Sequence, residues 1–449
     1  MYKKILLEIK ALFILAIPVL FTQITQISIN VINNLILGHF SNIDIIAFTI
    51  SISIWFPIIL LGHGILLSLI PIISQLYGVG NFIYIKYKIH QVYLLSILLS
   101  FIIMLIIYII SIYIKYIPNT HHLLFYKVSI LLKIILWSTP AYLFLQILRC
   151  IFEGLTFTIP MMIISFLGML CYIPLNFMFI YGFYFIPRVG GLGCGLSIVI
   201  IYWIMCIMAL IWFIISKSFK NIFTIKFITK PNFTIFKKIL ILGLPIGLSI
   251  FFEVTLFTIV SLFIYSMGIE QIISHQIALN ISSFIFIIAF SLSTAVTIRI
   301  GYFLGYNKKI QAKQISWITQ IVGMVITILI SSVIIYFRKN IISLYNQDIN
   351  IINLSSKLVL LSVLYQIPDT IHIIGIGILK GYKDTISIFL ITFLSYWIIG
   401  LPIGYILSLT HLLTNNPMGP AGFWVGFVVA LTISSVLTIY RIIIVQQKH

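Results

Sequence analysis

The sequence predicts an all-α polytopic membrane protein with about twelve transmembrane helices, arranged as two six-helix bundles that repeat each other in parallel. Three features support this fold class: the apolar content, the length of the apolar runs and the correspondence between the two halves of the chain. Of the 449 residues, 61% are hydrophobic and only 8% are charged. In lipid, only helices and closed β-barrels satisfy the backbone, and these continuous runs lack the alternation of barrel strands.

The apolar runs predict about twelve spans, because a helix needs roughly 20 apolar residues to cross a bilayer. The first run is too long for the core of a signal peptide, so we interpret it as a retained span. The polar stretch 216–238 is predicted to be a cytoplasmic linker loop between an N-terminal bundle, 1–215, and a C-terminal bundle, 239–449. The spans are predicted at residues 11–36, 45–76, 90–114, 124–152, 158–182, 190–215, 239–264, 272–304, 315–337, 351–379, 384–409 and 421–445.

The basic residues predict the orientation in the membrane. Lysine and arginine favour cytoplasmic loops, and most of the 27 basic residues fall on one side when both termini are placed inside. The linker alone carries Lys217, Lys220, Lys226, Lys230, Lys237 and Lys238. Membrane orientation therefore explains the net charge of +19, and no nucleic-acid partner is predicted.

The two halves of the chain correspond to each other at a nearly constant spacing. In each matched pair, the second member lies 227 to 229 residues after the first. This order favours duplication of a six-span unit, whose even number of spans gives both copies the same orientation and a pseudo-twofold axis along the membrane normal. The pairs are Pro18 and Pro245, Gly154 and Gly381, Thr158 and Thr385, Pro174 and Pro402, Gly190 and Gly419, and Gly193 and Gly422.

Two of the eight acidic residues lie plainly inside predicted spans, Glu253 in the seventh and Asp369 in the tenth. A carboxylate near a span centre costs roughly 2.5 kcal/mol or more to insert, so such residues are candidates for ion or proton sites. The alternative is that each is neutral and hydrogen-bonded for structure. His372, one helical turn after Asp369, could relay protons, although a hydrogen-bonded helix-end or packing role is the more common one for such a histidine.

The sequence contains no nucleotide-binding loop, nucleophile motif or zinc motif, so neither an enzyme nor catalytic residues are predicted. Ten short segments, however, occur together in a recognisable order. They are Pro18-Val19-Leu20, Ser53-Ile54-Trp55, Gln75-Leu76-Tyr77-Gly78, Pro140-Ala141-Tyr142, Ile173-Pro174-Leu175-Asn176, Gly191-Leu192-Gly193-Cys194-Gly195, Phe251-Phe252-Glu253-Val254-Thr255-Leu256-Phe257, His275-Gln276-Ile277-Ala278-Leu279-Asn280, Leu379-Lys380-Gly381-Tyr382-Lys383-Asp384 and Gly422-Phe423-Trp424.

Through these segments nearly the whole chain resembles the multidrug and toxic compound extrusion (MATE) family, most closely its bacterial NorM-like branch. The resemblance implies a monomeric antiporter of the bacterial inner membrane that exports cationic, amphipathic compounds by alternating access. Na⁺ or H⁺ is the implied coupling ion. Glu253 and Asp369 fall where the family has its C-terminal cation-binding acids, and Tyr365, Asn280 and His275 fall on matching positions nearby.

One position departs from the family pattern. The family usually has an aspartate in the first helix, in the stretch matched here by Ile32-Asn33-Asn34-Leu35. Asn33 cannot gain or lose a proton near neutral pH, and Asn176 in the fifth span can hydrogen-bond but not titrate. We therefore predict that coupling runs through the two acids of the second half.

Two other functions compete with drug export. A lipid-linked saccharide flippase of the same wider superfamily would need basic residues for phosphate groups, whereas these spans offer two acids. A passive channel or structural membrane protein is a further alternative, but duplicated bundles with a few buried acids fit alternating access better.

Overall fold

The structure is a computed structural model that describes residues 2–38, 40–116, 122–183, 187–216, 230–412 and 416–448. Nearly all of these residues are helical, and they form no β-sheet. Within them, eleven helices are long and apolar enough to cross a membrane, and the bent pair Leu123–Ile135 and Ser138–Gly154 makes a twelfth span if it is counted as one. The predicted all-α class with about twelve spans is confirmed.

The chain divides into two compact units, which we describe separately. Unit 1 consists of Met1–Ala16 and Leu248–His449, and unit 2 of Ile17–Gly247. The first and the seventh span therefore each contribute residues to both units. The predicted linker carries Lys217, Lys220 and Lys226, which lie outside the described residues, and the seventh span already begins at Phe233. The division into 1–215 and 239–449 stays a prediction.

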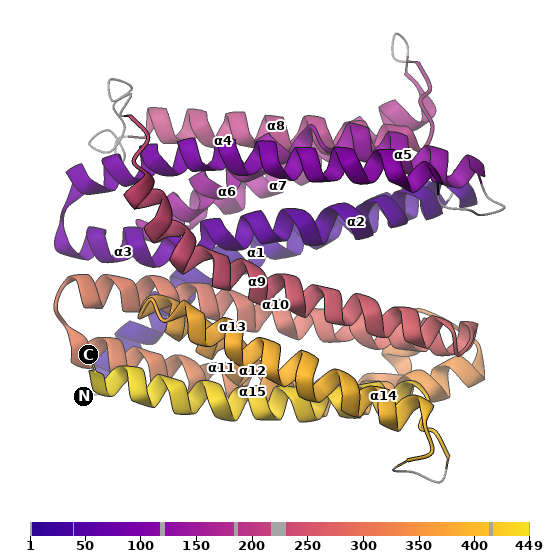
Figure 1. Cartoon of the computed structure of the whole chain (residues 1–449). Helices are drawn as coiled ribbons and strands as arrows, with labels where there is room; N and C mark the ends of the chain where they lie inside the picture. The colour runs from indigo at the N-terminus through magenta and orange to yellow at the C-terminus, as the bar shows by residue number, and fades with distance from the viewer. Residues whose placement is uncertain are drawn as a thin grey trace. The chain divides into compact units, whose positions relative to one another are not determined.

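Unit 2 contains most of α1 and the helices up to α8 (Figure 1). Short polar side chains begin several of them, as helix N-termini require. Asn81, for example, accepts a hydrogen bond from the backbone N–H of Tyr84. The helices are α1 (Tyr2–Gly38), α2 (Asn42–Leu67), α3 (Leu69–Val79), α4 (Phe82–Tyr113), the 3-10 turn η1 (Ile114–Tyr116), α5 (His122–Ile135), α6 (Ser138–Gly154), α7 (Ile159–Tyr181) and α8 (Leu192–Ile215).

Unit 1 is built around α12, which packs against α10, α11 and α15 (Figure 1). Asp348 caps α12 by accepting a hydrogen bond of 2.8 Å from the backbone N–H of Asn350. The helices are α9 (Phe233–Tyr265), α10 (Ile269–Gly305), α11 (Lys309–Ser343), α12 (Ile349–Gly381), α13 (Thr385–Phe393), the π-helix η3 (Leu394–Gly400), α14 (Leu401–Leu409) and α15 (Pro420–Lys448).

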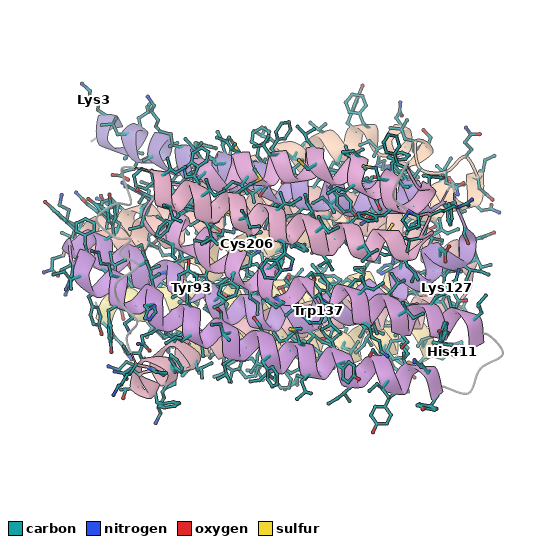
Figure 2. All side chains as sticks on the ribbon, turned by 90° about the horizontal axis from the view of Figure 1, so that it is seen from above. Lys3, Tyr93, Lys127, Trp137, Cys206 and His411 are labelled. Atoms are coloured by element: carbon teal, nitrogen blue, oxygen red, sulfur yellow. The ribbon has the colours of Figure 1, made fainter. Side chains whose placement is uncertain are left out.

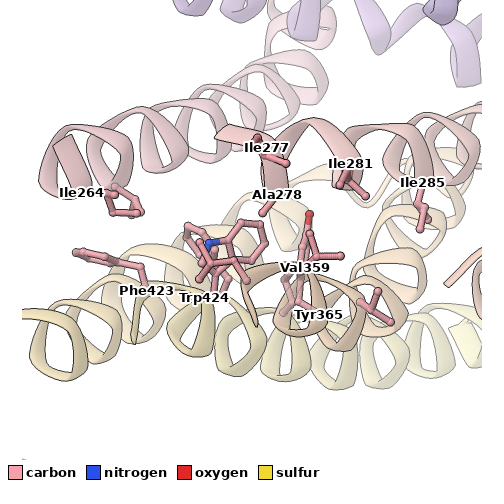
Figure 3. Close-up of a cluster of buried hydrophobic side chains, with 14 of the residues drawn as sticks. Ile264, Ile277, Ala278, Ile281, Ile285, Val359, Tyr365, Phe423 and Trp424 are labelled. Atoms are coloured by element: carbon pink, nitrogen blue, oxygen red, sulfur yellow. The ribbon is translucent and has the colours of Figure 1, made fainter. Parts of the chain in front are cut away.

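A hydrophobic cluster fills the interior of unit 1 between α9, α10, α12 and α15 (Figure 3). Trp424 is completely buried at its centre, and its ring lies 5.6 Å from the ring of Tyr365. Tyr365 itself is nearly buried, with a relative exposure of 5%. Packing in this cluster therefore fixes the part of α12 that precedes Asp369.

Three spans contain interruptions that hydropathy did not predict. Ser68 separates α2 from α3, and its hydroxyl donates to the carbonyl of Ile65 at 2.8 Å. Helices α5 and α6 meet at an angle of 44°. The eleventh span is continuous in direction but includes the π-helix η3, a form that is rare and often occurs at functional sites.

Ion pairs hold the helix ends within each unit. In unit 2, Lys127, which is labelled in Figure 2, binds Asp44 at 2.5 Å. Within unit 1, Arg441 binds Asp384 at 2.5 Å, and Arg299 pairs with Glu8 at the start of α1. These pairs occupy three of the six acids that lie outside the middle of the predicted spans.

Candidate functional site

Six of the eight acidic residues have a structural role in this fold. Glu8, Asp44 and Asp384 are ion-paired, as is Glu153, which accepts a 2.7 Å bond from Arg149 in the interior of unit 2. The remaining two lie at helix starts, where the helix dipole favours negative charge. Asp348 caps α12, and Glu270 lies exposed in the first turn of α10. Only the two acids inside spans are left without such a role.

Glu253 lies in the middle of α9, where it is half-buried beside aromatic side chains. The ring of its neighbour Phe252 lies 5.0 Å from the ring of Phe393 and 5.5 Å from that of Trp397. The indole N–H of Trp397 donates to the carbonyl oxygen of Phe252 at 2.9 Å. Helices α9 and η3 are thereby fastened to each other one residue away from the acid.

Asp369 lies on α12 and is almost completely buried. It follows Pro368, which has no backbone N–H to donate to the preceding turn and so loosens the helix at this point. Tyr365, one turn earlier on the same face, is within hydrogen-bonding reach of Ser282 on α10. Asp369 therefore sits on a firmly packed helix, beside a locally weakened part of its backbone.

The structure brings the two acids together. Their carboxyl groups lie close enough for their charges to interact, and Tyr365 and Tyr396 lie within the same range. Neither Glu253 nor Asp369 forms a hydrogen bond or an ion pair with any residue that the structure describes. Two neighbouring buried carboxylates repel each other, and a proton or a cation shared between them removes the repulsion.

The donor set fits a small hard cation as well as a proton. Carboxylate and phenol oxygens are the kind of ligand that such cations prefer. No group of three or more histidine, cysteine, aspartate or glutamate side chains converges anywhere in the described part of the chain. Glu253 and Asp369, together with neutral oxygens nearby, are the residues of this set that could hold a Na⁺ ion.

The predicted polar residues of α10 occupy different surroundings. His275 is completely buried, with its Nε2 3.2 Å from the hydroxyl of Ser261 and its ring 5.7 Å from that of Trp424. Asn280 is exposed on unit 1, and its side chain forms no hydrogen bond among the described residues. His275 is thus joined through Trp424 to Tyr365, whereas Asn280 is not part of the buried cluster.

Two aromatic residues of this site were missed from the sequence. Because η3 lies against α9 and α12, Tyr396 comes close to both acids and Trp397 donates to the carbonyl of Phe252, the neighbour of Glu253. In the sequence, two adjacent aromatic residues within an apolar run look the same whether they face lipid or line a site. The π-helical turn itself follows from packing and cannot be seen in the hydropathy pattern.

Unit 2 contains a separate buried cluster of amides around Asn33. The side-chain oxygen of Asn33 accepts a hydrogen bond from the Tyr172 hydroxyl and another, of 2.8 Å, from the amide of Asn176. The Asn33 Nδ2 and the Asn176 Oδ1 have no partner in the described part of the structure. Asn33 therefore accepts two bonds as a carboxylate would, but it cannot exchange a proton. Tyr172 lies one turn before Asn176, and that spacing was the signal by which it could have been found.

A duplicated all-helical protein with two acids inside its spans that form no ion pair belongs to the class of secondary membrane transporters. Comparison with known proteins identifies the family. The MatE family model matches residues 18–178 and 245–406, one match in each half of the chain. The chain belongs to the MatE family of transporters and is not an enzyme.

Relatives and solved structures agree with this membership. The chain is 41% identical over 447 residues to multidrug resistance protein MdtK of Yersinia pseudotuberculosis, covering 99% of this chain and 97% of the relative. A Yersinia pestis protein of the same name matches equally. The eukaryotic MATE transporter AtDTX14 has the same fold, with a TM-score of 0.86 at 18% identity over 99% of this chain and 98% of its own. A transporter from Pyrococcus furiosus gives a TM-score of 0.86 at 17% identity over 98% and 96%.

Proposed function

We propose that this transporter exports cationic, amphipathic compounds in exchange for Na⁺ or H⁺ by alternating access. The observation that carries the proposal is the pair formed by Glu253 and Asp369, which lies inside the spans, is mutually repulsive and forms no hydrogen bond or ion pair with the described residues. The names of the Yersinia relatives, which describe multidrug resistance proteins, support the substrate class.

Exchange follows from competition for the same negative charge. A proton or Na⁺ on the acid pair cancels the repulsion, and so does the positive charge of a bound drug. Binding of the ion then weakens binding of the drug, and by linkage the drug weakens binding of the ion by the same factor. Release of the drug on one side can in this way be driven by ion entry from that side.

The coupling site of this chain lies in unit 1 under this proposal. An exchanger needs a group whose charge or ligation differs between states, because only differential affinity shifts an equilibrium. The Asn33 amide is neutral and does not gain or lose a proton as the pH changes. Glu253 and Asp369 are therefore assigned the coupling, while Asn33 and Asn176 assist with hydrogen bonds.

A lipid-linked saccharide flippase is the alternative, since a shared fold does not define the cargo. The Pyrococcus furiosus transporter is described as having a binding pocket of reversed polarity that suggests a different function. A phosphate-bearing cargo would need unpaired basic groups, whereas Arg149 is bound to Glu153 and Arg441 to Asp384. The acid pair favours a cationic cargo.

We further propose that the protein acts as a monomer in the bacterial inner membrane, with both termini in the cytoplasm. The distribution of basic residues along the sequence supports this orientation.

Efflux from cells that lack their own drug pumps tests the proposal. Cells expressing the protein are loaded with an amphipathic cationic dye such as ethidium, and pH and Na⁺ gradients are imposed separately. Faster efflux under one of the gradients is expected, with no effect on an anionic lipid-linked sugar. The proposal would be contradicted if dye levels did not respond to either gradient and equalled those of pump-deficient cells that do not express the protein.

A further inference from the structure

A buried histidine beside the acid pair has one free nitrogen. His372 lies on α12 one turn after Asp369, and only 1% of its surface is exposed. Its Nδ1 lies 2.9 Å from the hydroxyl of Thr438 on α15, while its Nε2 has no partner among the described residues. A buried polar atom without a partner destabilises the fold, so its persistence needs a reason.

The ring faces the same cluster as the acids. Its centroid lies 5.9 Å from the ring of Tyr396, which itself interacts with Glu253 and Asp369. Residues three apart on a helix are neighbours, so His372 and Asp369 share one face of α12, where a single water could bridge them. Thr438 on α15 adds a further polar side chain, so that polar groups extend from the acid pair through His372 to α15.

The partner on Nδ1 suits a group that must exchange protons. A hydroxyl can donate to a bare Nδ1 or accept from a protonated one, so Thr438 accommodates both tautomers of the ring without moving. A carbonyl or a carboxylate at that place would hold a single tautomer.

We propose that His372 relays protons between the acid pair and the end of α12 that carries Lys380, an inference that rests on the function proposed above. The O–H bond of the protonated carboxyl group breaks and an N–H bond forms at Nε2, which leaves a carboxylate beside an imidazolium. The imidazolium then loses its Nδ1 proton to the Thr438 oxygen, and the hydroxyl passes its own proton to a water molecule. Charge and protons balance, and the ring ends as the other neutral tautomer.

Few other groups around the ring can titrate. Asp369 lies on its own helix, Tyr396 on η3, and Arg441 one turn after Thr438, where it is bound to Asp384. From α10 the neighbouring polar residue is Ser293, and from α11 it is Gln320; neither titrates. A change in pH profile on altering His372 would therefore report on the ring and the acid pair.

Purified protein in lipid vesicles, with ethidium as the probe, tests the relay. Three quantities are measured: dye uptake driven by a pH gradient, the dye Kd, and exchange of labelled for unlabelled dye without a gradient. In His372→Gln, proton-driven uptake is expected to fall at least about tenfold, as when a proton-transferring group is removed. The Kd and the gradient-free exchange should stay at parent values, because neither needs net proton movement.

Further variants separate a relay from a packing role. Thr438→Val should slow proton-driven uptake and shift its pH profile, whereas Thr438→Ser should restore both. His63→Gln is the matched control: His63 is also buried with a hydroxyl partner, Tyr142 at 3.1 Å, but has no carboxylate one turn away on its helix. It should behave like the parent.

The outcomes distinguish the two proposals. A parent without ion-driven dye uptake would defeat the proposed function itself. A parent driven by a pH gradient together with a His372→Gln variant of equal rate and pH profile would overturn the relay alone. Coupling of the parent to Na⁺ but not to H⁺ would overturn the relay as well. If His372→Gln loses dye binding, the comparison of Thr438→Val with Thr438→Ser decides whether the relay exists. Equal rates of proton-driven dye uptake in those two variants would count against the relay.

Discussion

The partners of each acidic side chain separate structural from functional residues in this protein. Four acids are ion-paired and two lie at helix starts, while Glu253 and Asp369 form no hydrogen bond or ion pair with the described residues and lie close to each other, with Lys380 near enough to act on Glu253 through its charge. The sequence identified these two because mid-span acids are rare. It could not identify Tyr396 or Trp397, whose roles depend on contacts between helices far apart in the chain.

Neutralising Glu253 should stop coupled transport without harming the fold. Glu253→Gln removes the charge that the ion and the drug compete for, and it also removes an insertion cost of roughly 2.5 kcal/mol or more. We expect no gradient-driven dye efflux at near-normal membrane expression. Glu270→Gln, at an exposed helix start, is the control and should pump normally. Parent-like efflux by Glu253→Gln would make Glu253 a structural residue.

Asn33 offers a second test at the same scale. Asn33→Ala leaves Tyr172 and Asn176 without their shared acceptor, at a cost of about 1–3 kcal/mol for each buried group. A lower melting temperature in detergent and modestly weaker dye binding are expected, with coupling retained. Asn33→Asp keeps both accepted bonds and adds a titrating group, so the pH optimum of transport should shift. An unchanged pH optimum of transport would show that a titrating group at position 33 takes no part in proton coupling.

At the scale of the helices, hydropathy predicted the spans well and their interruptions not at all. The predicted seventh span, 239–264, lies within α9, and the predicted tenth, 351–379, lies within α12. The break at Ser68, the 44° bend between α5 and α6, and η3 arise from packing and local hydrogen bonds. Apolar periodicity contains no information about them, yet η3 completes the site.

Close packing of α14 against α15 should depend on glycine. A Cβ atom on Gly426 would lie 2.7 Å from the carbonyl oxygen of Gly400 and from the Cα of Gly404, and backbone atoms cannot move aside cheaply. Small residues at such crossings let membrane helices approach each other. Gly426→Val should therefore lower the melting temperature clearly. Gly419→Asn is the control, since its φ of 62° tolerates asparagine and nothing lies within 4 Å of the added Cβ. Equal melting temperatures for both variants would contradict this view of the crossing.

For the whole molecule, sequence and structure agree on the class and on the number of spans. The duplicated halves appear as two separate matches to the family model, at residues 18–178 and 245–406. The division of the chain into 1–215 and 239–449 stays a prediction, and α1 and α9 each contribute residues to both compact units. A repeat spacing defines which residues correspond, and not which helices pack together.

The orientation in the membrane is a prediction at this scale. Basic residues gather in the loops that are inside when both termini are cytoplasmic, and such loops are retained on that side. A fluorescent reporter that matures only in the cytoplasm should therefore fluoresce when fused after residue 449. A reporter that is active only outside the inner membrane should be silent there, and activity of that second reporter would reverse the orientation.

Coupling through Glu253 and Asp369, and not through Asn33, is the feature on which the proposed function depends most. It can be tested by reconstituted antiport, in which ion flux and dye flux are recorded together across an imposed pH or Na⁺ gradient for the parent, Asp369→Asn and Asn33→Ala. We predict that Asp369→Asn loses ion-driven dye movement, while Asn33→Ala keeps the parent ratio of ions to dye at a reduced rate. Full coupling in Asp369→Asn together with its loss in Asn33→Ala would contradict this assignment and place the coupling site in unit 2.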